Sequence, residues 1–340
     1  MSLTNVAPAQ ERCMSTMPEL GVNFSHRHAA WLGLDPDALL RALLEDLGVR
    51  RFRISVYWDE IAPAPDTLDF EPVRRWLDPI QRSGAKALVT VGLKAQRWPE
   101  FYPPSWLIAD NPIPHGAQLD SHPRVVTHLL LMLERLTAYL ADYDAIDAWQ
   151  VENEPWLPSM RGTVGWQFTP DLLAQEIAVV RESDPRHRPI VVNHSSQNCF
   201  DRRAQLAFPL ADVIAENVYT RKPNRWPWPR YFNVYALWLY APRLRQYAGL
   251  LRRLDRPLWI TELQAEPWET RDVKQLTPAD IGSVSPNRIR DNLRLVAGAG
   301  ASRVYLWGAE WWRYTATHDR DARYWDLAQR LFTQPVAPLR

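Results

Sequence analysis

The stretch "DPDALLRALLEDLGVRRFRISVYW", residues 35–58, predicts a helix followed directly by a strand. Asp35 stands at the expected N-cap and Pro36 at the first helical position, while Gly48 follows the last turn. Between them, leucines recur at helical spacing and form one apolar stripe. A helix with one apolar face, followed by a strand, is the building unit of a sheet that is covered by helices.

The same alternation continues along the chain. Strands are expected at 19–25, 50–58, 85–93, 145–152, 188–193, 211–219, 256–262 and 302–308. Helices are expected at 35–49, 71–84, 122–143, 170–183, 231–253, 278–297 and 321–332. Eight such strands predict a single α/β domain, a (β/α)8 TIM barrel. The alternative, an open doubly wound sheet, lacks its glycine fingerprint, because "VAGAGAS" (296–302) closes a helix instead of opening one.

Composition narrows the class of protein. Residues 1–18 are expected to form a poorly ordered tail and residues 19–340 the catalytic barrel. A net charge of +1 argues against a nucleic-acid partner or a membrane surface. The start of the chain lacks the basic and apolar regions of a signal peptide, and "VYALWLYAP" (234–242) is too short to span a membrane, so a cytoplasmic location is the default.

The reactive residues of a barrel lie where its strands end. Polar or aromatic side chains at these positions are Arg53, Lys94, Asn153, Glu154, Asn193, His194, Asn217, Tyr219, Glu262 and Trp307. Glu154 and Glu262 face one mouth from strands four and seven, and paired carboxylates are the minimum set for cleaving a glycosidic bond. Arg53 would keep a neighbouring carboxylate ionised, whereas a carboxyl beside Trp and Pro would have a raised pKa. This favours Glu262 as nucleophile and Glu154 as acid/base.

Five strand-end segments carry a resemblance to retaining glycoside hydrolases of clan A, including the cellulase-like family 5. These segments are "WQVENEP", "PLWITELQ", "FRISVYW", "AENVYT" and "YLWGAEWW". The resemblance implies that Glu154 is the acid/base and that Glu262 forms a covalent glycosyl intermediate. It further implies that Asn153 binds the sugar 2-hydroxyl, that Arg53 and Tyr219 orient Glu262, and that Trp307 forms a platform under the sugar.

Two positions depart from the cellulase-like pattern. Where that branch carries a His near the end of strand three, this chain reads "VGLKAQRW", with Lys94 in the segment. Asn217 stands two residues before Tyr219, where the cellulase-like branch has a second His. These departures leave the chemistry of the two Glu intact and give no ground for assigning cellulose as the substrate.

Aromatic residues are expected to line a cleft at the mouth. The chain has 17 Trp, and clusters of Trp and Pro are expected in loops that follow the strands, at 96–106, 221–232, 266–270 and 309–314. Trp98 and Lys94 are expected to bind substrate from the region after strand three, and Asn217 from the end of strand six. His26, in "HRH" (26–28), is expected to bind substrate, because no third ligand joins it to form a metal site. No metal or organic cofactor is expected.

The expected partner is an oligosaccharide, a polysaccharide or a small glycoside. Two alternatives use the same barrel: a catalytically silent carbohydrate-binding protein, or a transglycosylase in which a sugar replaces water as the acceptor. A metal-dependent or enolate-forming barrel enzyme would need clustered metal ligands at the strand ends. The identity of the sugar, exo or endo action, and the oligomeric state are left open by the sequence.

Overall fold

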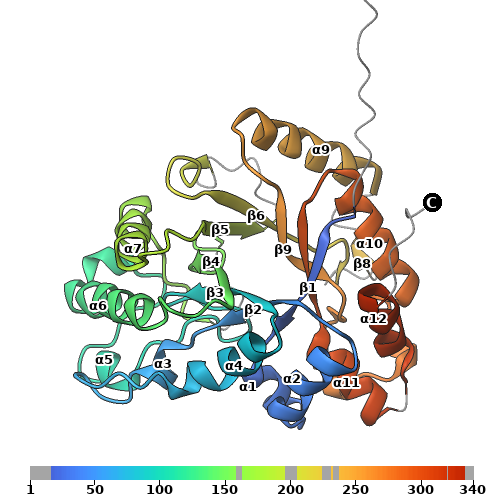
Figure 1. Ribbon diagram of the computed structural model, residues 1–340, viewed down its shortest axis with the longest axis horizontal. Helices are drawn as coiled ribbons and strands as arrows, with labels where there is room; N and C mark the ends of the chain where they lie inside the picture. The colour runs from blue at the N-terminus through green and yellow to red at the C-terminus, as the bar shows by residue number, and fades with distance from the viewer. Residues whose placement is uncertain are drawn as a thin grey trace, which may run out of the picture.

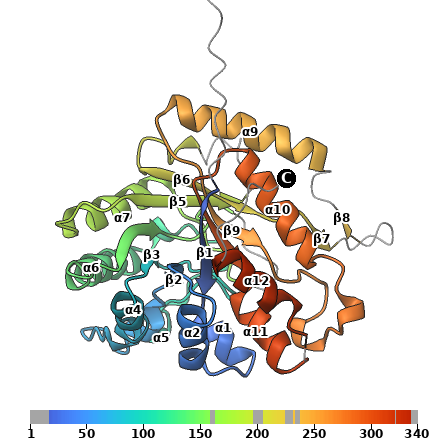
Figure 2. The ribbon, with the colours of Figure 1, turned by 45° about the vertical axis from the view of Figure 1, so that its right-hand side comes forward.

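The structure is a computed structural model that describes residues 17–157, 163–195, 205–223, 231–232, 237–319 and 321–333. Most of the expected tail, and part of the loop 221–232, lie outside the described residues. Figure 1 shows the strands at the centre of the molecule and the helices around them. Figure 2 shows the same arrangement from a second direction.

Eight parallel strands close into a barrel in the order β1-β10-β9-β6-β5-β4-β3-β2. Their bounds are β1 Glu19–Phe24, β2 Arg51–Ser55, β3 Lys86–Val91, β4 Ile146–Val151, β5 Ile190–Ser195, β6 Val213–Val218, β9 Trp259–Gln264 and β10 Arg303–Trp307. The pairing of β1 with both β2 and β10 closes the sheet. The predicted (β/α)8 barrel is therefore confirmed, and each expected strand is present.

Helices and short elements fill the connections between the strands. The longer helices are α2 Pro36–Glu45, α4 Glu71–Arg82, α6 Pro123–Tyr139, α7 Pro170–Ser183, α9 Leu237–Arg253, α10 Pro286–Gly298, α11 Ala309–Thr317 and α12 Arg323–Thr333. The short ones are α1 His26–Trp31, α3 Trp58–Ile61, α5 Ser105–Ile108, η1 Leu119–Ser121, η2 Val273–Gln275 and η3 Pro278–Asp280. A two-stranded ribbon, β7 Lys222–Pro223 and β8 Tyr231–Phe232, extends the loop after β6.

The N-cap, the glycine after the last turn and the apolar stripe predicted for α2 are all present in the structure. The Asp35 carboxylate accepts hydrogen bonds from the backbone N–H groups of Asp37 and Ala38, at 2.9 and 3.4 Å. Gly48 has φ of +68°, a left-handed conformation that glycine adopts without strain. The stripe Leu39, Leu40, Leu43, Leu44 and Leu47 is buried. Burial of each such side chain contributes about 1.5–3 kcal/mol.

Along the barrel axis, a layer of apolar side chains in the interior is followed by a layer of polar ones. A buried apolar cluster consists of Leu88, Ala148, Val191, Val213, Ala215, Trp259 and Tyr305. One step further along the strands, the inward positions become polar: Arg53, Gln150, Asn193, Asn217 and Thr261 are all buried. Because side chains two residues apart point the same way, this change of composition creates a polar layer at the carboxyl ends of the strands.

Several predicted boundaries and one class of element were wrong. Residues 231–232 form β8, and α9 begins at Leu237. The helix expected from 278 begins at Pro286, where the Ser285 side chain accepts from the Arg288 N–H at 3.2 Å and caps it. The cluster 309–314 forms α11 instead of a loop, and "HRH" begins α1. Trp and Pro content alone does not distinguish a mouth loop from a short helix that starts immediately after a strand.

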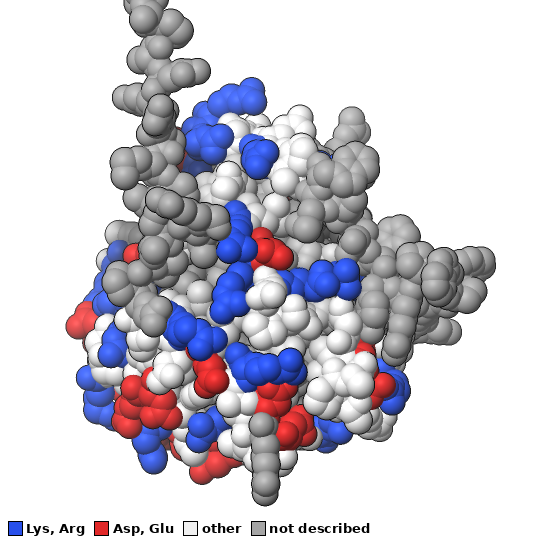
Figure 3. Space-filling view, turned by 90° about the vertical axis from the view of Figure 1, so that its right-hand side faces the viewer, with Lys and Arg blue, Asp and Glu red and all other residues white. Residues whose placement is uncertain are grey.

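The described helices include none with the length and apolar character needed to cross a membrane. On the face shown in Figure 3, Lys and Arg side chains gather in the upper part, while both signs of charge mix in the lower part.

Candidate active site

The end of β4 has an unusual backbone. Glu152 and Glu154 have φ of +60° and +47°, which non-glycine residues seldom adopt and which costs on the order of 1–3 kcal/mol each. Hydrogen bonds from the ends of neighbouring strands hold this turn. The Asn153 N–H donates to the Lys94 carbonyl at 2.8 Å, and the Glu154 N–H donates to Asn193 Oδ1 at 2.7 Å. The turn therefore presents Asn153 and Glu154 to the mouth in one fixed orientation.

Glu154 has no cationic partner in direct contact. Asn217 Nδ2 donates a hydrogen bond to Glu154 Oε1 at 2.9 Å, and no ion pair in the described part of the chain reaches this carboxyl group. Burial raises the pKa of Glu154 to about 7, and the negative charge of Glu262 acts in the same direction. A carboxyl group with this pKa can hold a proton near neutral pH and can also release it.

Glu262 has the opposite environment. Arg53 Nη1 donates to Glu262 Oε1 at 2.8 Å, and the Tyr219 hydroxyl donates to Glu262 Oε2 at 2.5 Å. The Glu262 side chain is nearly buried and the Arg53 side chain fully so. These two donors fix the orientation of the Glu262 carboxyl group, with one oxygen held by a guanidinium and the other by a phenol. Burial and the charge of Glu262 in turn raise the pKa of Tyr219 well above its usual range, so this hydroxyl keeps its proton.

A β-bulge in β9 brings Glu262 to the mouth. Along β6, Glu216 pairs with Ile260 and the next residue, Asn217, pairs with Glu262. Along β10, Val304 pairs with Ile260 and Leu306 with Leu263. Over the paired stretch, β6 and β10 each have one residue fewer than β9. The extra residue of β9 forms the bulge. The extra residue lets Thr261 bond to Asn217 inside the barrel while Glu262 bonds to Arg53.

Arg53 links four strands. Besides Glu262, its guanidinium donates to Gln150 Oε1 at 2.8 Å, to Asn23 Oδ1 at 2.9 Å and to Asn153 Oδ1 at 2.7 Å. Because arginine only donates, these contacts fix the oxygen side of each amide toward it. The Nδ2 group of Asn153 is left as the donor available to a ligand.

The amides of β4, β5 and β6 form a continuous network. Asn193 Nδ2 lies 3.1 Å from Asn153 Oδ1 and 3.3 Å from Asn217 Oδ1. Thr261 Oγ1 donates to Asn217 Oδ1 at 2.6 Å, which directs the Asn217 Nδ2 group toward Glu154. Asn217 therefore positions the carboxyl group of Glu154.

Trp307 belongs to a charged cluster at the mouth. The Arg97 guanidinium lies 3.9 Å from the centre of the indole, and Trp307 Nε1 donates to Glu266 Oε1 at 2.7 Å. Arg97 also pairs with Glu266 and, at 2.8 Å, with Glu310. Arg97 therefore occupies space against the indole, so a sugar can stack only where the guanidinium leaves the ring open.

Two of the predicted binding residues, Lys94 and His26, have other contacts, and a third, Trp98, is exposed. Lys94 is buried, and its ammonium donates to the backbone carbonyls of Glu154 at 2.9 Å and Leu157 at 3.3 Å. His26, at the start of α1, contacts Glu60 at 2.9 Å and stacks on Trp76 of α4. Trp98 is 64% exposed, as a sugar platform at the rim would be.

Glu152 points away from the mouth, as strand alternation predicts. Its carboxyl group accepts from the Leu93 and Lys94 N–H groups at 2.7 and 2.6 Å and lies against Glu176 of α7. Burial raises the pKa of Glu152 to about 7, and burial with the charge of Glu152 raises the pKa of Glu176 well above its usual range. The Glu152 carboxyl group thus links the end of β4 to the segment that follows β3.

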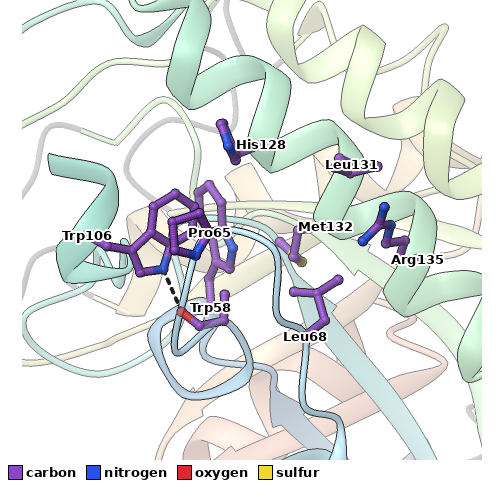
Figure 4. A pocket seen from close by; sticks show the side chains of 9 residues that line it. Trp58, Pro65, Leu68, Trp106, His128, Leu131, Met132 and Arg135 are labelled. Atoms are coloured by element: carbon purple, nitrogen blue, oxygen red, sulfur yellow. Dashed lines mark hydrogen bonds between the residues drawn. The ribbon is translucent and has the colours of Figure 1, made fainter.

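The described residues include no cluster of metal ligands, and a small pocket lies away from the mouth carboxylates. Within the described ranges, no group of three or more His, Cys, Asp or Glu side chains is arranged to bind a metal ion. A small pocket lies between α3, α6 and α5 (Figure 4), where Trp106 Nε1 donates to the Ala62 carbonyl at 2.8 Å. None of the mouth carboxylates lines it.

Solved structures share this fold. A GH5_18 protein from Streptomyces cattleya in complex with GlcNAc has a TM-score of 0.58 and 17% identity, over 86% of this chain and 70% of its own. An exo-β-1,4-mannosidase from Opitutaceae bacterium strain TAV5 has a TM-score of 0.59 and 18% identity, over 86% and 51%. A β-galactosidase from Rahnella sp. R3 has a TM-score of 0.60 and 13% identity, over 87% and 51%.

These structural neighbours are clan A glycoside hydrolases. The expected resemblance is therefore confirmed at the level of the fold, and the subfamily is unresolved. The chain spans about half the length of the mannosidase and of the β-galactosidase. No protein-family model matches the sequence, and no curated protein matches it either.

Sequence reasoning missed several residues of the site. Arg97 and Glu266 were noticed only as members of Trp and Pro clusters, and neither was expected to bond to Trp307. Gln150 lies within β4 and Asn23 within β1, deeper in the barrel than the residues at the strand ends. Inward position on a strand was the one signal that could have found these two.

Proposed function

We propose that the protein is a retaining glycoside hydrolase that cleaves a β-linked glycoside, with Glu154 as acid/base and Glu262 as nucleophile. The observation that supports this most strongly is the contrast between the two carboxyl groups. Glu262 is bonded by Arg53 and Tyr219, whereas Glu154 receives a neutral amide and has its pKa raised to about 7. One group is suited to attack and the other to transfer a proton.

The first step forms a bond between a Glu262 oxygen and the anomeric carbon. As the bond from this carbon to the leaving group breaks, the proton of Glu154 passes to the departing oxygen. The positive charge that develops on the sugar ring lies near two carboxylates, which stabilise it. The Asn153 Nδ2 group would donate to the sugar 2-hydroxyl, since Arg53 already occupies the amide oxygen.

The second step uses the same residues in reverse. Once Glu262 is an ester, its negative charge is gone, and one of the causes that raise the pKa of Glu154 is removed. Glu154, now ionised, takes a proton from water as the water oxygen attacks the anomeric carbon. The ester bond breaks, and Glu262 leaves as a carboxylate. A sugar hydroxyl in place of water would give transglycosylation.

Two aromatic residues would contribute to sugar binding. We assign to Trp307 the stacking position beside the reacting sugar, on the part of the ring not covered by Arg97, and to Trp98 a rim position. Lys94 would act indirectly, because its ammonium holds the backbone of Glu154. Its loss would disturb the geometry of the acid/base more than the binding of sugar.

Azide rescue tests the two roles separately. We expect Glu154→Ala and Glu262→Ala to lower kcat/KM by about a thousandfold or more on an aryl β-glycoside, with β-mannosides and β-galactosides tried first. Azide should restore turnover in both variants, giving the β-glycosyl azide with Glu154→Ala and the α-glycosyl azide with Glu262→Ala. These products follow because azide attacks opposite faces of the sugar in the two cases.

Glu266→Gln is the matched control, because its carboxylate lies at the same mouth but is bonded to Arg97 and Trp307. Its activity should not respond to azide. Near wild-type activity in either alanine variant, or the same azide anomer from both, would contradict the assignment. Binding of sugars without turnover by the wild-type protein would instead favour the silent carbohydrate-binding barrel.

A further inference from the structure

Lys222 is a cation at the mouth without a partner of opposite charge. It is half-buried in β7, and no ion pair joins it to a carboxylate within the part of the chain that the structure describes. Its ammonium lies 4.8 Å from the centre of the Trp268 ring. A partly buried ammonium lacks part of its hydration, so it favours any anion that can replace the lost water.

Ring contacts connect this cation to the reacting centre. Trp268 meets Tyr219 edge to face with ring centres 4.9 Å apart, and Tyr219 donates to Glu262 at 2.5 Å. The ammonium also lies within electrostatic range of Glu154. Lys222 is therefore connected, through Trp268 and Tyr219, to the carboxyl groups of the barrel mouth.

Hydrogen bonds fix the backbone next to Lys222 and at Trp268. The Arg221 N–H donates to Gln264 Oε1 at 3.0 Å, and Gln264 Nε2 donates back to the Arg221 carbonyl at 2.8 Å. Gln264 is fully buried, two residues beyond Glu262. On the other side, the Trp268 N–H donates to Ser283 Oγ at 2.9 Å. These bonds hold Lys222 and Trp268 in place before any ligand arrives.

We propose that Lys222 and Trp268 recognise an anionic group, a carboxylate or a sulfate or phosphate ester, on the glycoside that binds at Glu154 and Glu262. This rests on the proposed glycosidase function and narrows its substrate class to acidic sugars. Trp268 supplies the apolar face of the subsite and Lys222 its positive charge. The nucleophile Glu262 repels an anion, and the Lys222 ammonium offsets this repulsion, so Lys222 determines whether an acidic sugar is accepted.

The test compares each neutral aryl β-glycoside with its C6-carboxylate and its 6-sulfate. Wild-type protein should favour one of the charged forms, with a kcat/KM at least tenfold above that of the neutral form. In Lys222→Met, which keeps an unbranched side chain against Trp268, this ratio should fall by about tenfold to a hundredfold. The wild-type ratio should also decline as salt rises from about 0.05 to 0.5 M.

Lys274→Met is the control, because Lys274 is also a lysine over a tryptophan, 4.2 Å from the Trp31 ring, and bonds to the Trp31 carbonyl. It should leave the ratio unchanged. The carboxylate and sulfate arms identify which anion is used. An equal loss on neutral and charged substrates in Lys222→Met, or a wild-type preference for neutral ones, would overturn the proposal while leaving the glycosidase function intact. Turnover of none of these glycosides would overturn both.

Discussion

Replacing Asn217 with alanine should move the alkaline limb of the pH profile upward. Asn217 Nδ2 donates to Glu154 Oε1 at 2.9 Å, and this hydrogen bond lowers the pKa of Glu154 against the effect of burial. A general acid loses activity as pH rises through its pKa. Removing a donor that favours the ionised form raises the pKa, so Asn217→Ala should stay active to higher pH.

The size of the shift follows from the strength of the bond. A hydrogen bond to a charged group is worth about 1.5–3 kcal/mol, and one pKa unit corresponds to about 1.4 kcal/mol. Glu154 is partly exposed, so water will replace some of the lost interaction. We therefore expect the limb to move up by roughly one unit, from about 7 for the wild-type protein.

The assay is kcat/KM against pH on a glycoside with a poor leaving group, so that proton donation limits the rate. Asn153→Ala is the matched control, because Asn153 bonds to Arg53 and Asn193 and not to Glu154. It should lower the plateau without moving the alkaline limb. An unshifted or downward-shifted limb in Asn217→Ala would refute the argument, since a lost substrate contact changes only the plateau.

Three further substitutions, one of them a control, test the support behind the site. Gly92→Ala should lower the free energy of unfolding in urea by about 3 kcal/mol, because φ is +125° and an added Cβ would lie 2.2 Å from the Glu152 carboxyl group. Gly33→Ala, at φ of +81° with open space around it, should cost only about 1 kcal/mol, and equal losses would contradict the packing argument. The raised pKa values of Glu152 and Glu176 mean that the folded state keeps protons that the unfolded state releases, so stability should fall as pH rises from about 5 through 7. Glu176→Gln should flatten that fall, and an unchanged dependence of unfolding free energy on pH would count against the pair.

The barrel could be predicted because each of its helices and strands is indicated by residues that are close together in the sequence. Leucine spacing, the Asp35 cap and Gly48 act within a few residues, and the eight repeats of strand and helix follow from such signals. The expected site residues at the mouth followed from the same source, since a barrel places the carboxyl ends of its strands together. The roles of Glu154 and Glu262 were suggested by residue type and by the resemblance, and remain predictions.

Local signals were weaker where one pattern fits two structures. The segment 309–314 carries the aromatic residues expected of a mouth loop, yet Gly308 precedes a helix there. Lys94 follows its strand as a substrate-binding residue would, but its ammonium donates to backbone carbonyls in the loop after β4. In both cases the conformation or contact depends on residues from other parts of the chain, which the local sequence does not reveal.

The sequence by itself determined the order of the elements and the kinds of side chain at the strand ends. The contact of Arg53 with Glu262, 209 residues away, was implied by the resemblance, whereas only the tertiary structure decided that Asn217 bonds to Glu154, 63 residues away. The bulge in β9 and the position of Arg97 against Trp307 also arise only there. The physical reason is that barrel closure sets these distances, and closure depends on the register of all eight strands together.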